Sequence, residues 1–163
     1  MLEPIQGEAG IVIPPAEYLD QLRSICDAKG WLLVFDEIQT GNGRTGSYFA
    51  FQQTRAKPDI LTTAKGLGNG LPIGVCLASK EIADLMVAGS HGTTFGGNPL
   101  VSRAACAVID TIQSEKLADR AKEMGGWLLE QFENQLGDLP QVVDIRGVGL
   151  MLAIELRGPC SEL

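Results

Sequence analysis

The sequence has little from which a metal site could be built. It has one histidine, His91, and its four cysteines form no Cys-x-x-Cys pair. Because zinc sites combine several such ligands at short spacing, we expect no metal. Three cysteines, Cys26, Cys76 and Cys106, lie in apolar segments typical of a core helix or strand. We therefore expect buried free thiols and a cytoplasmic protein, since disulfides are rare in reducing compartments.

The 163-residue sequence also lacks a cluster of lysine and arginine, and its formal net charge is −7. An acidic surface repels a phosphate backbone, so nucleic acid is not an expected partner. No apolar run approaches the roughly 20 residues that a membrane-spanning helix requires, so no membrane partner is expected either. The composition, 45% hydrophobic and 20% charged, is that of an ordinary globular protein.

Helix and strand patterns alternate along the first part of the chain. After Pro14 and Pro15, apolar residues recur at helical spacing until Gly30, a residue suited to a left-handed helix cap. Short apolar runs at 32–36, 59–64 and 74–78 are typical of strands. This alternation predicts an α/β protein with a mainly parallel sheet.

A different unit is predicted towards the end of the chain. Asn98 and Pro99 start one helix, and residues 117–136 form a second helix with its apolar residues on one face. Residues 142–145 and 150–156 then have the pattern of antiparallel strands. We place a domain change near residue 114, which gives a larger domain over 1–113 and a smaller α+β domain over 114–163.

Asp36 is the first candidate site residue. The apolar strand at 32–36 ends in Asp36-Glu37, and open α/β sheets bind ligands at this end of their strands. A carboxylate there suits pyridoxal phosphate, because that cofactor withdraws electrons best when its ring nitrogen is protonated. Gln39 is close enough in the sequence to reach the phenolic oxygen of the same ring. The alternative is that Asp36 and Glu37 merely end a strand in solvent.

Lys65 is the second candidate, since it follows a strand of small residues and is flanked by glycines that let the chain pass close to a ligand. A lysine that forms a Schiff base needs an amine held partly out of water, so that the neutral nucleophile is populated. The alternative is an ordinary solvated lysine in a loop.

Residues 93–99 are a candidate phosphate site. They combine the hydroxyls of Thr93 and Thr94 with two glycines and a helix start at Asn98. A turn followed by a capped helix would explain Asn98 and Pro99 without a ligand, but it leaves the threonines and glycines unused. We give His91 no role, because a lone histidine in a loop is more often structural or solvated.

Two nucleotide-binding motifs compete for the same segments. Gly41, Gly43 and Gly46 match the dinucleotide pattern G-x-G-x-x-G, but no strand leads directly into it and no helical periodicity follows it. The acidic strand could belong to a P-loop ATPase, but no lysine in the sequence follows a glycine, as that motif requires. Both alternatives fit less well than pyridoxal-phosphate chemistry.

Five segments, taken in order, resemble one family. They are LEPIQGEAG, LLVFDEIQTGNGRTG, PDILTTAKGLGNGLPIG, HGTTFGGNPL and DIRGVGLMLAIEL. With them the chain is similar to the class III, fold-type I pyridoxal-phosphate aminotransferases, and within these to the acetylornithine and succinylornithine aminotransferases. The resemblance implies the central part of the large domain of fold type I, followed by the start of the small domain. It also implies a homodimer with a shared active site that acts on amino acids and 2-oxo acids.

The resemblance assigns a role to each candidate residue. Lys65 would be the catalytic residue that forms the Schiff base, Asp36 the partner of the pyridine nitrogen, and Gln39 the contact to the phenolic oxygen. The residues that would bind the cofactor are Asp36, Glu37, Ile38, Gln39, Lys65 and Thr94, the last of them in the neighbouring subunit's site. Thr93 and Glu8 would belong to the substrate site. Thr93 would lie beside the bound amino acid, and Glu8 would pair with the substrate-carboxylate arginine when the site is empty, which would help the enzyme alternate between two substrates. Arg146 is interpreted as structural.

The same resemblance has gaps. The family's glycine-serine phosphate loop, its ring-stacking aromatic residue and its substrate-carboxylate arginine are not found in these 163 residues. We therefore expect a fragment of a longer enzyme that binds the cofactor weakly. The implied function is transfer of the terminal amino group of N-acetylornithine or succinylornithine to 2-oxoglutarate, in arginine metabolism. The alternatives are an ornithine or 4-aminobutyrate aminotransferase and a truncated, catalytically silent fragment.

Overall fold

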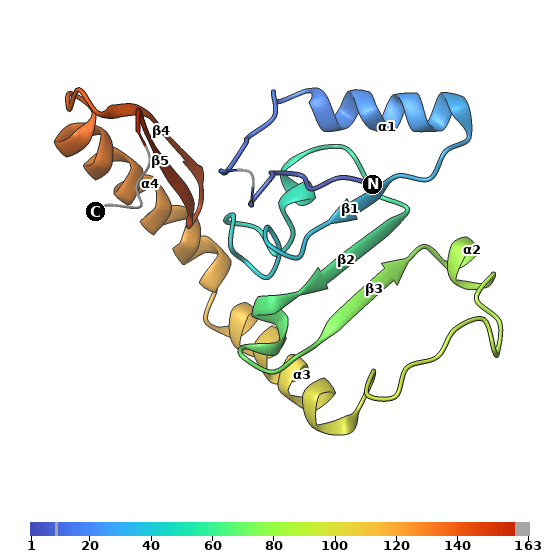
Figure 1. The fold of residues 1–163 in the computed structure, drawn as a ribbon. Coiled ribbons are helices and arrows are strands. Elements are labelled where there is room, and N and C mark those ends of the chain that lie inside the picture. Colours follow the sequence, from blue (N-terminus) through green and yellow to red (C-terminus); the bar gives the residue numbers. More distant parts are fainter. Residues whose placement is uncertain (9, 159–163) are drawn as a thin grey trace.

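The computed structural model of the protein describes residues 1–8 and 10–158 (Figure 1). Its elements follow the chain in the order α1 (Tyr18–Lys29), β1 (Val34–Asp36), a short 3₁₀ helix η1 (Ala50–Gln53), β2 (Ile60–Ala64), a second 3₁₀ helix η2 (Lys65–Gly68), β3 (Gly74–Ala78), α2 (Lys80–Ala83), α3 (Pro99–Ser114), α4 (Leu117–Leu136), β4 (Val142–Val148) and β5 (Met151–Leu156). Every helix and strand expected from the sequence is present, with boundaries that differ by a few residues.

The first three strands form one mixed sheet in the order β1-β2-β3. β1 and β2 are parallel, with Asp36 opposite Thr62, and Leu2 adds a parallel bridge to Phe35. β3 runs antiparallel to β2, with Ala64 opposite Gly74. The antiparallel direction of β3 makes the sheet of the described residues mixed, where a mainly parallel sheet was expected. Its physical reason is the short connection from Lys65 to Ile73, because a parallel return requires a crossover of a dozen or more residues.

A small apolar core joins α1 to β1. It consists of the buried residues Leu19, Cys26, Leu33, Phe35 and Ala56. The helix ends as expected at Gly30, which adopts the left-handed conformation with φ 65° and donates its N–H to Asp27. Figure 1 shows α1 running alongside β1, which places the helix over the strand that leads to Asp36.

An ion pair also ties α1 to the sheet. Arg23 donates from Nη1 to Oδ2 of Asp59 at 2.7 Å, and the same oxygen accepts the backbone N–H of Leu33 at 2.6 Å. Burial raises the pKa of the Asp59 carboxyl, but the hydrogen bonds from Arg23 and Leu33 outweigh it and the net pKa is lowered. Asp59 thus fixes the starts of both β1 and β2 against the helix.

The prediction for the cysteines holds for only one of them. Cys26 of α1 is buried in the apolar core between α1 and β1, whereas Cys76 on β3 and Cys106 on α3 are exposed. Among the described residues β3 pairs only with β2, so the strand is an edge strand and its side chains are largely uncovered. Cys160 lies outside the described residues.

The second half of the chain is helical up to a terminal hairpin. The side chain of Asn98 caps α3 as expected, accepting the N–H of Val101 at 3.0 Å. The chain turns at Lys116, which has φ 52°, and continues as α4. β4 and β5 form an antiparallel hairpin that packs on α4 (Figure 1). Gly125 of α4 lies so close to Gly149, in the hairpin turn, that a Cβ atom there would overlap the Gly149 carbonyl. The domain boundary near residue 114 stays a prediction.

Three further findings bear on the sequence-based expectations. No helix in the described ranges is long and apolar enough to cross a membrane. Within residues 1–8 and 10–158, no group of three or more histidine, cysteine, aspartate and glutamate side chains could hold a metal ion. The glycine motif at 41–46 leads into bends and the short 3₁₀ helix η1, so the described backbone lacks the long helix that a dinucleotide site requires.

Candidate active site

Two neighbouring strands deliver the principal candidate residues to one edge of the sheet. β1 ends at Asp36, and the parallel strand β2 ends at Ala64, directly before Lys65. The N–H of Glu37 donates to the carbonyl of Thr62 at 2.9 Å, which continues the pairing just past the end of β1. The carboxylate and the amine therefore leave the sheet at the same carboxyl-terminal edge, where ligands of open α/β sheets bind.

An open cavity of about 900 Å³ lies at this edge. Its walls come from three segments that are far apart in the sequence: Ile38 after β1, the chain from Ala64 through β3, and the start of α3. The lining residues are Ile38, Ala64, Lys65, Leu71, Pro72, Ile73, Gly74, Val75, Phe95, Gly96, Gly97, Asn98, Val101 and Ser102. A cavity of this size and largely apolar lining suits a flat organic ligand with one polar attachment point.

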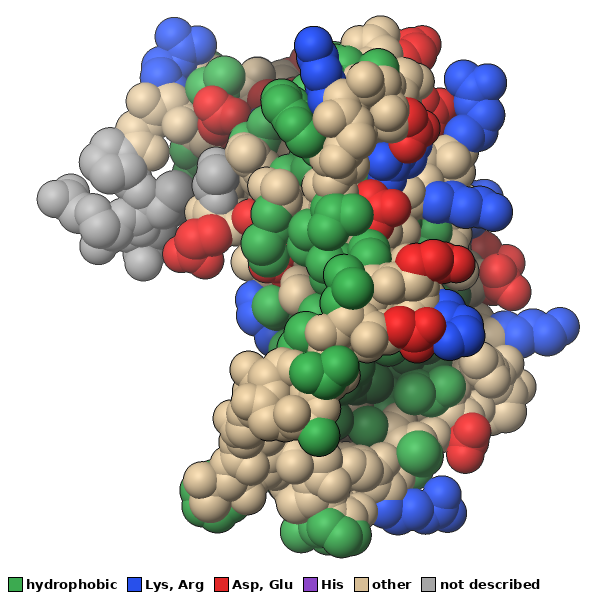
Figure 2. Space-filling model, turned by 90° about the vertical axis from the view of Figure 1, so that its right-hand side faces the viewer, with side chains coloured by type: hydrophobic (Ala, Val, Ile, Leu, Met, Phe, Trp, Pro, Cys, Tyr) green, Lys and Arg blue, Asp and Glu red, His purple; other side chains and the backbone are tan. Residues whose placement is uncertain are grey.

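Hydrophobic side chains remain uncovered near this cavity. Phe95 is 81% exposed and Leu100 is 72% exposed, and the segment before them carries Leu85, Met86 and Val87 in exposed positions. Figure 2 shows one face of the molecule, with hydrophobic side chains lining a hollow in its lower part. Exposed apolar surface of this extent marks a binding or association surface.

Asp36 keeps one carboxylate oxygen available. The side chain is half-buried, and its Oδ1 accepts the N–H of Ile38 at 3.0 Å. Oδ2 accepts no hydrogen bond from any residue that the structure describes. The hydrogen bond from Ile38 fixes the carboxylate. Oδ2 can then accept a hydrogen bond from a donor such as a protonated ring nitrogen.

Lys65 has an unusual backbone for a residue with a side chain. Its φ is 45°, in the left-handed region, and it opens the 3₁₀ helix η2. Such strain concentrates at functional sites, where the surrounding structure enforces it. The side chain lines the cavity but is exposed. The expected partial burial of its amine is therefore not provided by the described residues, because they wall the cavity only partly.

Gln39 and the loop that carries Glu8 lie together. A Cβ atom on Gly7 would lie 2.5 Å from the amide carbon of Gln39, so the glutamine packs directly on the backbone before Glu8. Gln39 is half-buried and Glu8 is exposed. This contact brings the segment 3–8 to the same loop that follows Asp36, and a Cβ atom at position 7 would displace the end of the Gln39 side chain.

Glu37 is a correction to the predicted site. Its side chain is fully buried and points to η1, where Oε1 accepts the N–H of Phe51 at 2.9 Å. Oε2 accepts the N–H of Ala50 at 2.9 Å and the hydroxyl of Thr40 at 2.5 Å. Burial raises the pKa of this carboxyl against the effect of the three donors. The carboxylate therefore supports the loop and is not available to a cofactor.

Thr93 and Thr94 lie outside the cavity formed by this chain. Both are exposed, and Thr93 is used locally, since its Oγ1 accepts the N–H of Gly96 at 3.2 Å. Neither threonine is among the residues that line the cavity, although Gly96, Gly97 and Asn98 beside them are. The structure thus brings the start of α3 to Lys65 but leaves the two threonines facing outward.

Asn42 is a residue that the sequence reasoning missed. Its Nδ2 donates to Oγ1 of Thr63 at 3.1 Å and to the carbonyl of Ala64 at 3.2 Å. It has φ 58°, a conformation that asparagine adopts more readily than most residues. An asparagine between two glycines predicts a tight turn, but it does not predict which strand the amide reaches.

The residues present fit one side of a pyridoxal-phosphate site, the group that the sequence motifs imply. The fit rests on the unpartnered Oδ2 of Asp36, the amine of Lys65 in the cavity, and the apolar walls that a flat ring requires. Ile38 lines the cavity, whereas Asp36 and Gln39 lie beside it and are not among its lining residues. Glu37 does not contribute its side chain. The described residues supply fewer contacts for the phosphate group of the cofactor than for its ring.

The family model for class III aminotransferases matches residues 1–162. Acetylornithine aminotransferase from Nitrosomonas europaea is 51% identical over all 163 residues, which cover 42% of that protein. Acetylornithine aminotransferase from Methanothermobacter thermautotrophicus is 47% identical over 99% of this chain and 41% of that protein. The chain spans about two fifths of the length of the curated relatives that it matches.

Solved structures give the same result for the fold. Ornithine aminotransferase from Plasmodium yoelii superposes with a TM-score of 0.92 at 40% identity, over 96% of this chain and 42% of that one. Acetylornithine aminotransferase from Elizabethkingia anophelis superposes with a TM-score of 0.91 at 38% identity, over 96% of this chain and 40% of that one.

Proposed function

Since the chain belongs to the class III aminotransferase family, we propose that the protein transfers the terminal amino group of N-acetylornithine, or of succinylornithine, to 2-oxoglutarate. The observation that carries the proposal is the cavity at the sheet edge, which contains Lys65 next to the strand end that presents Asp36. Curated relatives of 45–51% identity that share the acetylornithine name support this amino donor.

Pyridoxal phosphate, when bound, supplies an aldehyde that accepts the amine and a ring that delocalises the electron pair left on the substrate carbon. In our proposal Lys65, Asp36 and Gln39 would hold this cofactor at the edge of the sheet. The remaining tasks fall to side chains of the protein.

Lys65 has two tasks in this scheme. Its Nζ would hold the cofactor covalently, and as general base and acid it would take a proton from the substrate carbon and give it back. The left-handed backbone at Lys65 and its place at the end of β2 support this assignment, because both hold the base of the side chain in one direction.

Asp36 and Gln39 would act on the ring. Asp36 would hold the ring nitrogen protonated through Oδ2, since an opposite charge in a region of low dielectric favours the charged form of its partner. Gln39, held against Gly7, would donate to the phenolic oxygen. Ile38 lines the cavity between them and would contribute apolar contact rather than a polar one.

Glu8 and Thr93 would serve the substrate, and Thr94 would serve the neighbouring subunit. We propose a homodimer in which Thr94 binds the phosphate of the partner's cofactor. The outward position of both threonines and the exposed apolar segment around Phe95 support this arrangement. The cytoplasmic location suggested by the sequence stays a prediction.

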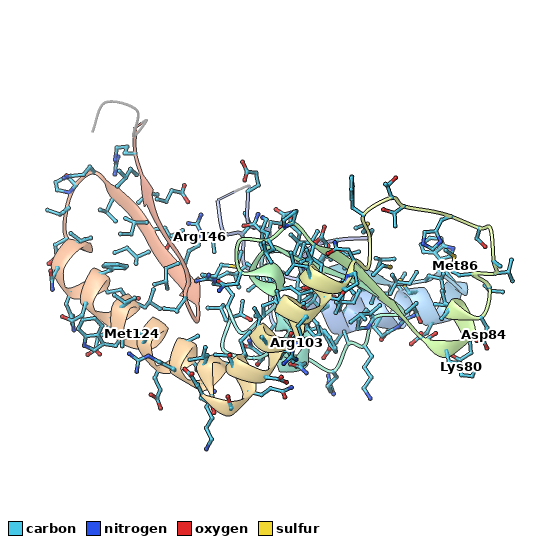
Figure 3. All side chains as sticks on the ribbon, turned by 90° about the horizontal axis from the view of Figure 1, so that it is seen from below. Lys80, Asp84, Met86, Arg103, Met124 and Arg146 are labelled. Atoms are coloured by element: carbon cyan, nitrogen blue, oxygen red, sulfur yellow. The ribbon has the colours of Figure 1, made fainter. Side chains whose placement is uncertain are left out.

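The proposal is tested with the complete gene product, incubated with pyridoxal phosphate and treated with borohydride, which makes the lysine linkage permanent. Peptide mass spectrometry is expected to find the cofactor mass on the peptide that contains Lys65. The variant Lys65→Ala should lose it, whereas Lys80→Ala should keep it, because Lys80 is a surface residue paired with Asp84 (Figure 3). Labelling elsewhere, or none in the wild-type protein, would overturn the proposal.

Ornithine is the second candidate donor, favoured by the TM-score of 0.92 with the ornithine aminotransferase from Plasmodium yoelii. Initial rates with N-acetylornithine, succinylornithine, ornithine and 4-aminobutyrate, each with 2-oxoglutarate, separate the candidates. We expect the highest kcat/KM with N-acetylornithine. A higher value with unmodified ornithine or 4-aminobutyrate would reassign the substrate while leaving the role of Lys65 intact.

A further inference from the structure

The turn that carries Lys65 packs against α3. The lysine faces the cavity of about 900 Å³, and behind the same turn lies a second cavity of about 600 Å³ that Gly66, Gly68 and Asn69 help to line. Leu67 is buried and anchors the middle of the turn. Besides the pairing of Ala64 with Gly74, the beginning of the turn, at Ala64 and Lys65, is held by polar contacts from outside the turn.

Asn42 supplies these contacts. Its carboxamide donates from Nδ2 to Thr63 Oγ1 at 3.1 Å and to the Ala64 carbonyl at 3.2 Å, and its Oδ1 accepts the Tyr48 hydroxyl at 3.4 Å. Asn42 is half-buried and lines the second cavity beside Gly66. One side chain thus bridges the loop after β1 and the end of β2.

The Ala64 carbonyl belongs to the peptide group that joins Ala64 to Lys65. The orientation of that peptide group determines the backbone direction at Lys65, whose φ is 45°. A left-handed residue with a side chain keeps this conformation only where its neighbours enforce it. The hydrogen bond from Asn42 is therefore a direct restraint on where the lysine side chain begins.

We propose that Asn42 is a positioning residue that fixes Lys65 relative to Asp36. The inference rests on the proposed function, since it assigns to Asn42 the geometry of the lysine that binds the cofactor. Asp36 and Asn42 lie in the same segment, and Glu37 between them anchors that segment through buried hydrogen bonds to Ala50 and Phe51. Asn42 connects this anchored segment to the lysine turn.

Three variants of the complete gene product test the proposal. Asn42→Gly retains a left-handed backbone but removes the carboxamide, and Asn42→Asp retains the size but places an acceptor against the Ala64 carbonyl. Asn69→Asp is the matched control, because Asn69 is also left-handed, with φ 46°, and lies in the same turn. Its side chain makes no hydrogen bond to another residue in the described part of the chain.

The first measurement needs no cofactor. Hydrogen–deuterium exchange of the free protein is expected to become about tenfold faster in the peptide covering residues 64–70 in both Asn42 variants, as the loss of one restraining hydrogen bond predicts. Asn69→Asp should leave the exchange of this peptide within about twofold of the wild type. Unchanged exchange in the Asn42 variants would overturn the proposal.

The second measurement follows the lysine itself. The rate at which pyridoxal phosphate becomes attached to Lys65 is expected to fall about tenfold in the Asn42 variants, and the pH midpoint of the visible absorbance of the attached cofactor should move. A merely structural residue would lower the unfolding temperature and leave that midpoint unchanged, which would contradict the proposal. Should Asn42→Gly fail to fold, Tyr48→Phe removes only the 3.4 Å hydrogen bond to Oδ1 and should move both readouts in the same direction by a smaller factor.

The two proposals fail in distinguishable ways. If wild-type protein attaches no cofactor at Lys65, the proposed function is wrong, while the exchange experiment still decides whether Asn42 restrains the turn. If the wild type is labelled at Lys65 and the Asn42 variants match it in exchange, attachment rate and pH midpoint, only the role of Asn42 is wrong.

Discussion

Arg146 donates a hydrogen bond from Nε to the carbonyl oxygen of Ile11 at 2.8 Å, although 135 positions separate the two residues in the sequence. Its Nη2 donates to the carbonyl of Gly10 at 2.6 Å, and its Nη1 is shared between Asp144 and Glu155 on the hairpin. Figure 3 shows the residue between the hairpin and the N-terminal half of the chain. The structural role expected for Arg146 thus consists of joining the hairpin to the loop that follows Glu8.

Replacing Arg146 by lysine should therefore loosen a distant loop. A lysine amine cannot reproduce the planar fork that reaches two carbonyls and two carboxylates at once. We expect the peptide containing residues 10–12 to exchange hydrogen for deuterium on the order of tenfold faster. Arg103→Lys is the control, since Arg103 is an exposed residue of α3 without an ion pair among the described residues. Equal exchange in both variants would show that the loop does not depend on Arg146.

Asp36→Asn should separate cofactor binding from catalysis. The amide retains the size of the carboxylate and its acceptor for Ile38, but it no longer stabilises a positive charge at the ring nitrogen. We expect kcat to fall by about 10²-fold in the complete enzyme, with cofactor still attached to Lys65. Asp138→Asn, on the surface, should have no such effect. Full activity of Asp36→Asn would remove Asp36 from the proposed mechanism.

Glu37→Ala should destabilise the fold rather than change the chemistry. It leaves the N–H groups of Ala50 and Phe51 and the Thr40 hydroxyl without their acceptor in a buried position. We expect a loss of about 3 kcal/mol in the free energy of unfolding, measured by urea titration. A loss below roughly 0.5 kcal/mol would mean that water replaces the carboxylate at no cost.

The pH dependence of Glu37 has a defined sign. Its pKa in the folded protein is raised above the ordinary 4.5 by burial, so its protonated form favours folding. That contribution is fully present below pH 4.5 and is lost as the pH rises through the raised folded pKa. The stability difference between wild type and Glu37→Gln should therefore shrink as the pH rises from 4 to 8, to an extent that urea titrations measure. A difference that grows with pH would contradict the shift.

Asp59 should show the opposite dependence. Its pKa is lowered from 3.8 in the folded protein, so the ion pair with Arg23 stabilises the fold above that pH and is lost as the pH falls towards the folded pKa. Asp59→Asn should cost about 1–2 kcal/mol at pH 7, and the cost should diminish between about pH 4 and pH 2. Asp110→Asn, an exposed residue of α3, should show neither effect. A cost for Asp59→Asn that does not change with pH would mean that packing, not charge, is lost.

Gly125→Ala and Gly126→Ala make a matched pair within α4. A Cβ at position 125 would overlap the carbonyl of Gly149, so the helix and the hairpin must separate, at about 1–3 kcal/mol. A Cβ at position 126 meets nothing within 4 Å, so its higher helix propensity should stabilise by roughly 0.5–1 kcal/mol. Thermal unfolding of both variants checks the prediction. A stabilised Gly125→Ala would mean that the helix–hairpin contact is looser than described.

The parts of the fold that sequence predicted are those whose signals are local. Asn98 caps α3 and Gly30 ends α1 because a side-chain acceptor and a left-handed residue act within one helical turn. The direction of β3 was not predicted, because strand pattern alone says nothing of polarity. The length of the connection after Lys65 was the signal that could have shown it.

In the candidate site, too, the sequence predicted only those features that have a local signal. Asp36 and Lys65 could be placed at one edge because both follow strands, but the two adjacent acids could not be told apart by composition. Side chains alternate along a strand, so Asp36 faces one way and Glu37 the other. The hydrogen bonds from Asn42 to Ala64 and from Arg23 to Asp59 join residues that are 22 and 36 positions apart. Such pairings follow from tertiary packing, which a single sequence does not state.

The pairing of Ala64 with Gly74 closes the chain from Lys65 to Ile73 at its base. Both ends of this loop are held by the pairing of β2 with β3, so we expect a change at its tip to have little effect on Lys65 at its base. A Cβ atom at Gly70 would meet nothing within 4 Å, so we expect that the chain can be lengthened there without moving the Lys65 amine. The β2–β3 pair would thus keep the position of Lys65 independent of the length of the loop between the two strands.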